Sequence, residues 1–415
     1  MRRLLTKLVF MCFSDFYRFM AALLDWRSHL RVLKGKPGFD VACITNFENE
    51  VQRYFMGMFF MKKSWVNGLR FSMDNTLVRY IMVNSTSAGL MEPSGKAEGK
   101  IQVRRAIANV IDKGAKVILF AAYIKRLFSE DELREIRAAY PNVAFTIGDN
   151  GTAWALIVDV FRAIEANNLN RFSRIMILGP NGFLGSTVVS VLKNSGFYNL
   201  VLLSSRSGKT NPFSGIKDIE LVIACTHHSN LELTADIVQN ISHDNGIYVV
   251  DVCRPVNFHY KEFEKCNNQK VKRQDAGVVF NKRLKYVFLP GAVFVLKKIG
   301  LSRRRLYGCF SEATAIGSLE SETLRKYDFM DTNRKVLKFV ETIFTEKGFK
   351  VSPPRNYGKD IGKQEKGREA VPEYAYPCVV KNTCEEDNIR VEEKNREPVP
   401  GYADARSEKN FGLSL

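Results

Sequence analysis

The stretch from residue 174 to residue 192, RIMILGPNGFLGSTVVSVL, constrains the fold of this chain more than any other. Its first part, Ile175 to Leu178, is a short apolar run typical of a strand that is buried on both faces. Gly179, Gly182 and Gly185 follow at a G-x-x-G-x-x-G spacing, and an apolar helical segment comes directly after them. This order predicts a parallel-sheet unit in which a sharp turn leads from a strand into a helix.

Such a turn is the part of a Rossmann-like fold that holds the pyrophosphate of a dinucleotide. Glycines allow the backbone to turn sharply and to approach the phosphates, and the orphan amides at the helix N-terminus attract the anion. We therefore predict that this turn binds a dinucleotide, and an ordinary glycine-rich turn is the alternative. The predicted binding residues are those of the turn itself: Gly179, Asn181, Gly182, Phe183, Leu184 and Gly185.

The segment after the next predicted strand, at residues 199–203, indicates which dinucleotide binds. NAD sites usually carry an acidic residue there that holds the ribose hydroxyls, whereas an arginine accommodates the 2′-phosphate of NADP. No Asp or Glu lies between Ser204 and Ser214, while Arg206 and Lys209 lie within this segment. The sequence therefore favours NADPH over NADH, with solvated loop charges as the alternative interpretation of both cations.

Alternating strand and helix patterns on both sides of the turn predict the α/β class. Buried strands are expected at 116–120, 143–147, 220–224 and 246–252, and helices at 101–113, 152–166, 306–319 and 331–347. A further helix is expected to begin at Ser129, because Glu132 completes a capping box. We predict a Rossmann-like doubly wound sheet, an N-terminal α/β substrate domain and C-terminal helices. The expected boundaries are 1–150 for the substrate domain, 151–300 for the Rossmann domain, 301–354 for the helices and 355–415 for a disordered, charged tail.

The charge of the chain is strongly positive, with a formal net charge of +18 and a pI near 9.5. Acidic and basic residues nearly balance in the predicted tail, so the excess belongs to the rest of the chain. Such a surface favours an acidic partner, and a basic protein without a polyanionic partner is the alternative. No recognisable nucleic-acid module is present, so we do not expect nucleic acid as the partner.

Cysteine usage and the N-terminal segment bear on the location of the protein. The eight cysteines are scattered, which indicates reduced thiols and a cytoplasmic protein. Residues 1–20 are aromatic with flanking Arg and Lys, and charges interrupt any membrane span. This segment is expected either to face the core or to contact a membrane surface as an interfacial helix.

The order and spacing of four motifs resemble the aldehyde-forming long-chain acyl-[acyl-carrier-protein] reductases over roughly residues 102–354. Besides the glycine turn, these motifs are FTIGDNGTAWAL at 145–156, a strand-end Asp251 followed by Pro255, and LYGCFSEA at 306–313. The resemblance implies that Asp251 and Pro255 lie at the cofactor site and that Cys309 is the catalytic nucleophile. Glu312 lies near Cys309 on one helical face, where it would either position a catalytic donor or water or serve the structure.

The departures from the family pattern lie in the half that would hold the acyl chain. Gly151 stands where the family has a histidine, and Asp149 stands where it has an asparagine. The segment 116–123 lacks the small hydroxyl residues of the family, and residues 1–100 match only weakly.

The resemblance implies NADPH-dependent reduction of a fatty acyl thioester to a fatty aldehyde through an acyl-cysteine intermediate. The thioester would be carried by an acidic acyl carrier protein or by coenzyme A. Two alternatives are an NADP-dependent dehydrogenase without covalent catalysis and a non-catalytic Rossmann nucleotide-binding protein. A metal site is not expected, because the spacing of the nearest candidates fits no standard zinc motif. These candidates are Cys225, His227, His228, Cys253 and His259.

Overall fold

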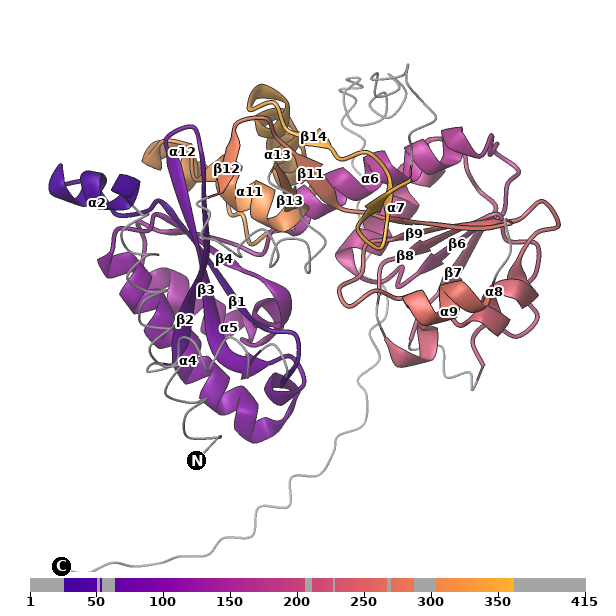
Figure 1. Ribbon diagram of the computed structural model, residues 1–415, viewed down its shortest axis with the longest axis horizontal. Helices are drawn as coiled ribbons and strands as arrows, with labels where there is room; N and C mark the ends of the chain where they lie inside the picture. The colour runs from indigo at the N-terminus through magenta and orange to yellow at the C-terminus, as the bar shows by residue number, and fades with distance from the viewer. Residues whose placement is uncertain are drawn as a thin grey trace, which may run out of the picture. The chain divides into compact units, whose positions relative to one another are not determined.

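The computed structural model describes residues 26–50, 53, 64–205, 211–226, 228–266, 270–286 and 304–361 (Figure 1). Several predictions lie outside these residues: Arg206, Lys209, His227, the N-terminal segment 1–20 and the tail beyond residue 361. Within the described residues, parallel strands alternate with helices, and the predicted α/β class is confirmed.

The N-terminal half of the chain contributes five strands to a six-stranded sheet in the order β12-β2-β3-β1-β4-β5, and β12 joins it from later in the chain. The strands β3, β1, β4 and β5 are parallel, and β2 and β12 are antiparallel additions at one edge. The strand bounds are Val41–Phe47 for β1, Trp65–Met73 for β2, Thr76–Thr86 for β3, Val117–Phe120 for β4, Ala144–Thr146 for β5 and Leu284–Tyr286 for β12. A first helix, α2, spans Trp26–Leu33.

Helices cover both faces of this sheet. On one face, α4 (Pro93–Asp112) and α5 (Glu130–Ala139) pack their apolar residues on Ala42, Ile44 and Ile118 (Figure 1). The predicted capping box of α5 is confirmed, because Ser129 and Glu132 exchange both hydrogen bonds. On the other face, α11 (Gly308–Ile316) and α13 (Arg334–Glu346) pack on alternate residues of the same strands, among them Cys43. The short helix α12 (Ser321–Lys326) lies between α11 and α13 in the chain.

The second sheet has seven strands in the order β16-β15-β10-β9-β8-β6-β7. Its parallel strands are β6 (Ile175–Leu178), β7 (Leu200–Leu203), β8 (Leu221–Ala224), β9 (Ile247–Asp251) and β10 (Val271–Asp275). Helices α6 (Asp149–Ala166) and α7 (Phe183–Asn194) cover one face, and α8 (Ala235–Ile241) covers the other. The predicted doubly wound sheet is therefore confirmed. The chain order of the strands reverses between β6 and β8, which is where doubly wound folds bind their ligands.

Helix α6 belongs to the cores of both sheets. Trp154 and Val158 lie in the core that also contains α11, whereas Leu156 and Val160 lie in the core beneath β6 and β8. The predicted start at Thr152 is three residues late, because Gly148 caps the helix in the left-handed conformation. This one helix therefore connects the glycine turn to the surroundings of Cys309.

The predicted boundaries at residues 300 and 355 differ from the observed pairing of the strands. β12 lies before residue 300, yet it pairs with β2 of the N-terminal sheet. β15 (Arg355–Asn356) and β16 (Lys359–Asp360) fall in the predicted tail, yet they extend the second sheet beyond β10. The prediction of disorder from residue 355 was wrong for 355–361, because Tyr357 anchors this hairpin. Its ring lies 4.1 Å from the Arg273 guanidinium, and its hydroxyl donates to the Phe258 carbonyl at 2.6 Å.

A small antiparallel sheet completes the fold, in the order β13-β11-β14. Its strands are β11 (Val278–Phe280), β13 (Arg305–Tyr307) and β14 (Lys350–Val351), and β13 leads directly into α11. The remaining helices are η1 (Gly89–Met91), η2 (Ala122–Arg126), η3 (Ser229–Leu231) and α9 (Tyr260–Lys265). Among the helices of the described residues, none is long and apolar enough to cross a membrane.

Candidate functional site

The glycine turn joins β6 to α7 and packs against the end of β8. Gly179 has a φ of +82°, and a Cβ atom there would lie 2.8 Å from the Cβ of Thr226. A Cβ atom on Gly185 would lie 2.8 Å from the backbone carbon of Gly179. Real Cβ atoms do not make contacts this short, so the packing of the protein itself requires glycine at both positions.

Gly182 differs from the other two glycines of the turn. Its φ of −81° and ψ of 160° suit any residue, and the nearest atom to an added Cβ is the Gly179 oxygen at 3.7 Å. The packing of the described protein atoms therefore does not require glycine here. Gly182 is the N-cap of α7, and because glycine has no side chain, the first amides of that helix have no side-chain cap. The turn thus presents open backbone donors in the way that a phosphate cradle requires.

The other predicted residues of the turn hold its shape. The Nδ2 atom of Asn181 donates to Oγ of Ser204 at 3.1 Å, which joins the turn to the end of β7. Phe183 and Leu184 pack against the core that includes Trp154 of α6. Arg206 and Lys209, predicted to contact the 2′-phosphate, lie outside the described residues.

Asp251 lies at the end of β9 with no exposed surface. Its Oδ1 accepts from the amide of Cys253 at 3.0 Å, and its Oδ2 accepts from the amide of Asn257 and from Arg273, both at 2.9 Å. Both carboxylate oxygens are thus used by protein donors that shape the loop after β9. Pro255 lies in this loop, next to Arg254. The geometry supports a loop-shaping role for Asp251 beside the sheet edge where a cofactor would lie.

Cys309 is the second residue of α11 and is partly exposed. The N-terminus of α6 lies directly against it, since a Cβ atom on Gly148 would come within 2.5 Å of the Cys309 Cα. A Cβ atom on Gly308 would likewise lie 2.6 Å from the Cα of Thr152. Glycines on both helices therefore allow the two N-termini to meet at the thiol.

This close approach also explains why the resemblance fails at Gly151. A Cβ atom there would lie 2.6 Å from the Gly308 carbonyl oxygen and 2.9 Å from the Glu312 Cβ. No side chain fits between the two helices at this position. A histidine side chain at position 151 would collide with α11.

Glu312 is fully buried and caps α6 from the neighbouring helix α11. One carboxylate oxygen accepts from the Thr146 hydroxyl and the other from the Gly151 amide, both at 2.6 Å. The Thr146 hydroxyl in turn accepts from the amide of Gly148 at 2.9 Å. Burial raises the pKa of Glu312 to about 7, although these two hydrogen bonds favour the charged form. The observed contacts support the structural interpretation of Glu312, which holds the helix N-terminus beside Cys309.

An ion pair at the C-terminal edge of the first sheet faces the thiol. Lys125 follows β4 in η2, and its Nζ lies 2.8 Å from Oδ1 of Asp149 at the start of α6. Burial raises the pKa of Cys309 to about 12; the Lys125 charge opposes this and the Asp149 charge adds to it. Lys125 was not predicted from the sequence. Its position just after a predicted parallel strand was the available signal, because such strand ends gather at one edge of a sheet.

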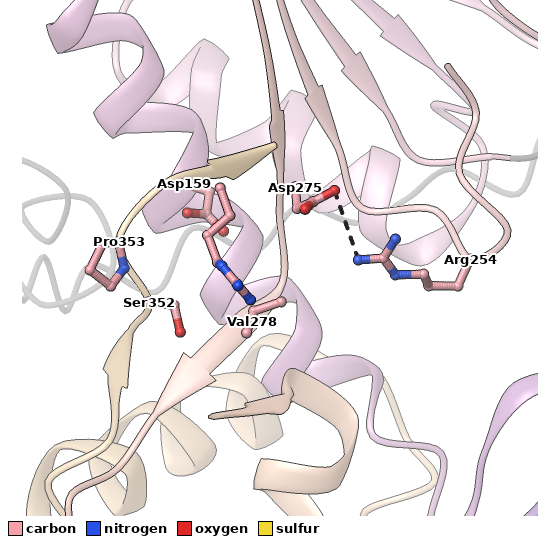
Figure 2. Close-up of a pocket in the computed structure, with 7 residues that line it drawn as sticks. Asp159, Arg254, Asp275, Val278, Ser352 and Pro353 are labelled. Atoms are coloured by element: carbon pink, nitrogen blue, oxygen red, sulfur yellow. Dashed lines mark ion pairs between the residues drawn. The ribbon is translucent and has the colours of Figure 1, made fainter. Parts of the chain in front are cut away.

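A small pocket lies where three segments cross between the two sheets (Figure 2). One segment is α6 with Asp159, the second runs from Asp275 to Val278, and the third runs from Ser352 to Arg355. The loop after β9 contributes Arg254. The Asp159 carboxylate accepts from the Gly277 amide at 3.0 Å, and burial raises its pKa to about 7.

Cys43 lies in the same core as Cys309, whereas Cys225 and Cys253 follow the ends of β8 and β9. Burial raises the pKa of Cys225 to about 12, and the Cys253 thiol donates to the Ala224 carbonyl at 3.2 Å. His259 pairs with Glu232 at 3.2 Å, and His227 lies outside the described residues. Within the part of the chain that the structure describes, no three His, Cys, Asp or Glu side chains are grouped as metal ligands.

No family model matches the sequence, and no curated protein matches it. Among solved structures, the chain is similar to an NAD-dependent malic enzyme from Thermotoga maritima, with 13% identity and a TM-score of 0.31 over 73% of this chain and 83% of that one. The malic enzyme from Entamoeba histolytica gives 11% identity and a TM-score of 0.35 over 74% of both chains. L-tryptophan dehydrogenase from Nostoc punctiforme gives 8% identity and a TM-score of 0.32 over 75% of this chain and 90% of that one.

Proposed function

We propose that this chain is an oxidoreductase that uses a nicotinamide dinucleotide. The observation that carries the proposal is the glycine at position 182. Gly182 is the N-cap of α7, at the switch point of the doubly wound sheet. The packing of the described residues does not require glycine there. An approaching pyrophosphate gives a reason for glycine at this position, since a side chain there would stand between the ligand and the α7 amides.

The residues present fit such a cofactor. The backbone of Gly182 and the first amides of α7 would hold the pyrophosphate, and Asn181 would hold the turn in place through Ser204. NADPH is proposed rather than NADH, because the segment after β7 carries Arg206 and Lys209 and no acid. When bound, NADPH supplies a hydride to the substrate.

The finer proposal is that the substrate is a fatty acyl thioester and that Cys309 is the nucleophile. The Cys309 thiolate attacks the carbonyl carbon, the bond between this carbon and the carrier sulfur breaks, and the carrier leaves as a thiol after taking a proton. After reduction of the acyl carbon, its bond to the Cys309 sulfur breaks and the aldehyde leaves. Thiolates suit both steps because they are strong nucleophiles and good leaving groups.

Lys125 and Asp149 set how easily this thiolate forms. With Lys125 paired to Asp149, the pKa of Cys309 is about 12 and the group is a thiol at neutral pH. In the proposed mechanism, Lys125 moves from the carboxylate toward the thiol when substrate binds, which lowers the pKa of Cys309. The N-terminus of α11 favours the same change, because Cys309 lies in its first turn.

The raised pKa of Cys309 also favours a second candidate function, an NADP-dependent dehydrogenase without covalent catalysis. In that case Cys309 remains a thiol, and the Lys125 ammonium donates a proton or a hydrogen bond to the carbonyl oxygen being reduced. The two functions differ in a direct observable, since only the first leaves an acyl group on the protein.

The proposed carrier of the thioester is an acidic acyl carrier protein or coenzyme A. The support is the net charge of +18, whose excess lies outside the nearly balanced tail. We also propose that residues 1–20 contact a membrane surface. This segment lies outside the described residues.

The test is to supply a long-chain acyl-coenzyme A and NADPH and to identify a fatty aldehyde by mass spectrometry. The expected result is aldehyde with the unaltered protein and none with Gly182→Val, whose side chain would block the cradle. Lys193→Ala, in the exposed last turn of the same helix, is the matched control and should keep full activity. Aldehyde formation by Gly182→Val at the rate of the control would contradict the proposed cradle.

A further inference from the structure

Arg254 occupies a loop that faces the ligand-binding edge of the doubly wound sheet. The loop follows β9, and its shape is fixed by Asp251, which accepts from the Cys253 amide on one side and the Asn257 amide on the other. The neighbouring Cys253 thiol contacts the Ala224 carbonyl at the end of β8. Arg254 is therefore held at the C-terminal end of two adjacent parallel strands, the edge where such sheets bind ligands.

The Arg254 guanidinium has hydrogen-bonding capacity that the described residues leave unused. Its nearest carboxylate is Asp275, at 3.9 Å, which is beyond hydrogen-bond distance (Figure 2). Asp275 is itself held at 2.9 Å by Arg273 and at 2.8 Å by the Gly358 amide. The side chain of Arg254 is 42% exposed, so its donors are accessible from solvent.

The same guanidinium lies over the ring of Tyr307. Its central carbon lies 5.3 Å from the centre of the Tyr307 ring, and Tyr307 is the N-cap of α11, two residues before Cys309. Arg254 thus lies beside the helix start that carries the proposed nucleophile. A ligand group bound by Arg254 would therefore lie close to the N-terminus of α11.

The other charged side chains of the pocket have partners, so the donors that remain suit an anionic ligand. Arg355 is paired with Asp360 at 3.0 Å, and Asp159 accepts from the Gly277 amide. Ser352 is 4% exposed, and its hydroxyl is buried without a hydrogen-bond partner among the described residues. Arg254 is the cation of this pocket without a carboxylate at hydrogen-bond distance, and the Ser352 hydroxyl is an additional donor.

We propose that Arg254, at the mouth of this pocket, binds a phosphate group of the arm that carries the thioester, and so selects phosphate-bearing thioesters over simple ones. The inference rests on the proposed function and adds a specificity-determining residue to it. Arginine suits this role because its planar fork binds phosphate oxygens in pairs. Coenzyme A and the prosthetic arm of an acyl carrier protein both offer such a phosphate, and the pyrophosphate of NADPH is the other source to be distinguished.

The experiment compares Arg254→Gln with the unaltered protein on two substrates. One is a long-chain acyl-coenzyme A, and the other is the same acyl group on N-acetylcysteamine, which has the thioester and no phosphate. For acyl-coenzyme A, we expect KM to rise about tenfold or more with little change in kcat, the scale of a lost charge-assisted hydrogen bond. For the short thioester we expect no change. Arg254→Lys should recover part of the loss, and Lys261→Gln, an exposed charge on α9, should behave as the unaltered protein.

A direct binding measurement tests the role of Arg254 independently of the proposed reaction. Titration of free coenzyme A by calorimetry should show weaker binding to Arg254→Gln, even where no thioester is reduced by any variant. The affinity for NADPH, followed by its fluorescence, should not change. An equal loss on both thioesters, or a loss of NADPH affinity, would overturn the assignment of Arg254 to the carrier phosphate.

Discussion

The two parts of the candidate site are encoded in different ways. The glycine turn lies within seven consecutive residues, from Gly179 to Gly185, and its function depends on backbone. The surroundings of Cys309 come from three separate segments, which carry Lys125, Thr146 with Gly148, and Glu312. A local motif specifies the first part, whereas the packing of two helix N-termini specifies the second. The comparison teaches that a dinucleotide turn can be recognised in a single sequence, while the environment of a nucleophile is created by the fold.

The largest expected effect is a difference in stability between substitutions at two glycines of the turn. Gly185→Ala should destabilise the protein by at least about 3 kcal/mol, because the added Cβ meets the Gly179 backbone, which cannot move aside. Gly182→Ala should cost about 1 kcal/mol or less, since its backbone angles suit alanine and no atom lies within 3.5 Å. Urea denaturation of both variants provides the measurement. Similar losses for the two variants would show that Gly182 is also needed for packing.

The fold could be predicted from the sequence because strand and helix patterns repeat at short range. These patterns identified β6, the glycine turn and α7 closely, and they placed Cys309 on a helix. They missed β12 and the hairpin from Arg355 to Asp360, since both join strands far away in the chain. A three-residue strand carries too little pattern to reveal a partner that lies more than two hundred residues earlier.

The individual side chains of the site show the same limit. Glu312 was left open between catalysis and structure, because its partners Thr146 and Gly151 lie more than one hundred and sixty residues earlier. Asp251 was assigned to the cofactor through a resemblance, whereas its contacts are with the loop after β9 and with Arg273. Both carboxylates face donors that only the folded chain brings to them.

The second prediction concerns the pH dependence that Glu312, beside Cys309, gives to the stability of the protein. Its pKa is raised from 4.5 to about 7 in the folded protein, so the folded state keeps a proton that the unfolded state releases. Stability from this group is fully present below pH 4.5 and is lost as the pH rises through about 7, a change of about 3 kcal/mol. Glu312→Gln removes this loss, so its stability relative to the unaltered protein should rise between pH 5 and pH 8.

Urea denaturation at pH 5 and at pH 8 measures this difference. Asp159, whose pKa is also raised to about 7, shifts the stability of both proteins in the same direction, so the comparison between them isolates Glu312. Parallel pH dependence in Glu312→Gln and the unaltered protein would mean that this carboxylate is not buried at the N-terminus of α6.

The third prediction concerns the ion pair beside the thiol. Asp149→Asn removes the carboxylate that raises the pKa of Cys309 and releases Lys125, so the rate of alkylation by iodoacetamide at pH 8 should increase about tenfold for each unit of pKa lost. Lys125→Met should decrease the rate. In the unaltered protein the rate should rise with pH without a plateau up to pH 10, because the pKa is about 12.

Peptide mass spectrometry assigns the alkylation to Cys309 rather than to Cys225 or Cys253. Opposite shifts in the two variants are the required result, since the two charges act on the thiol with opposite signs. An equal change of the alkylation rate in the same direction for both variants would show that the substitutions act by destabilising the fold. Loss of the shared ion pair would have that effect in both.

Covalent catalysis by Cys309 can be measured as the intact mass of the protein after incubation with a long-chain acyl thioester without NADPH. We expect one acyl group per chain, located on Cys309, and its discharge as fatty aldehyde when NADPH is added. Cys309→Ser should form neither adduct nor aldehyde, yet it should bind NADPH, because the glycine turn acts through backbone amides. Aldehyde formation by Cys309→Ser at the unaltered rate, or an adduct located on Cys225 or Cys253, would contradict the account.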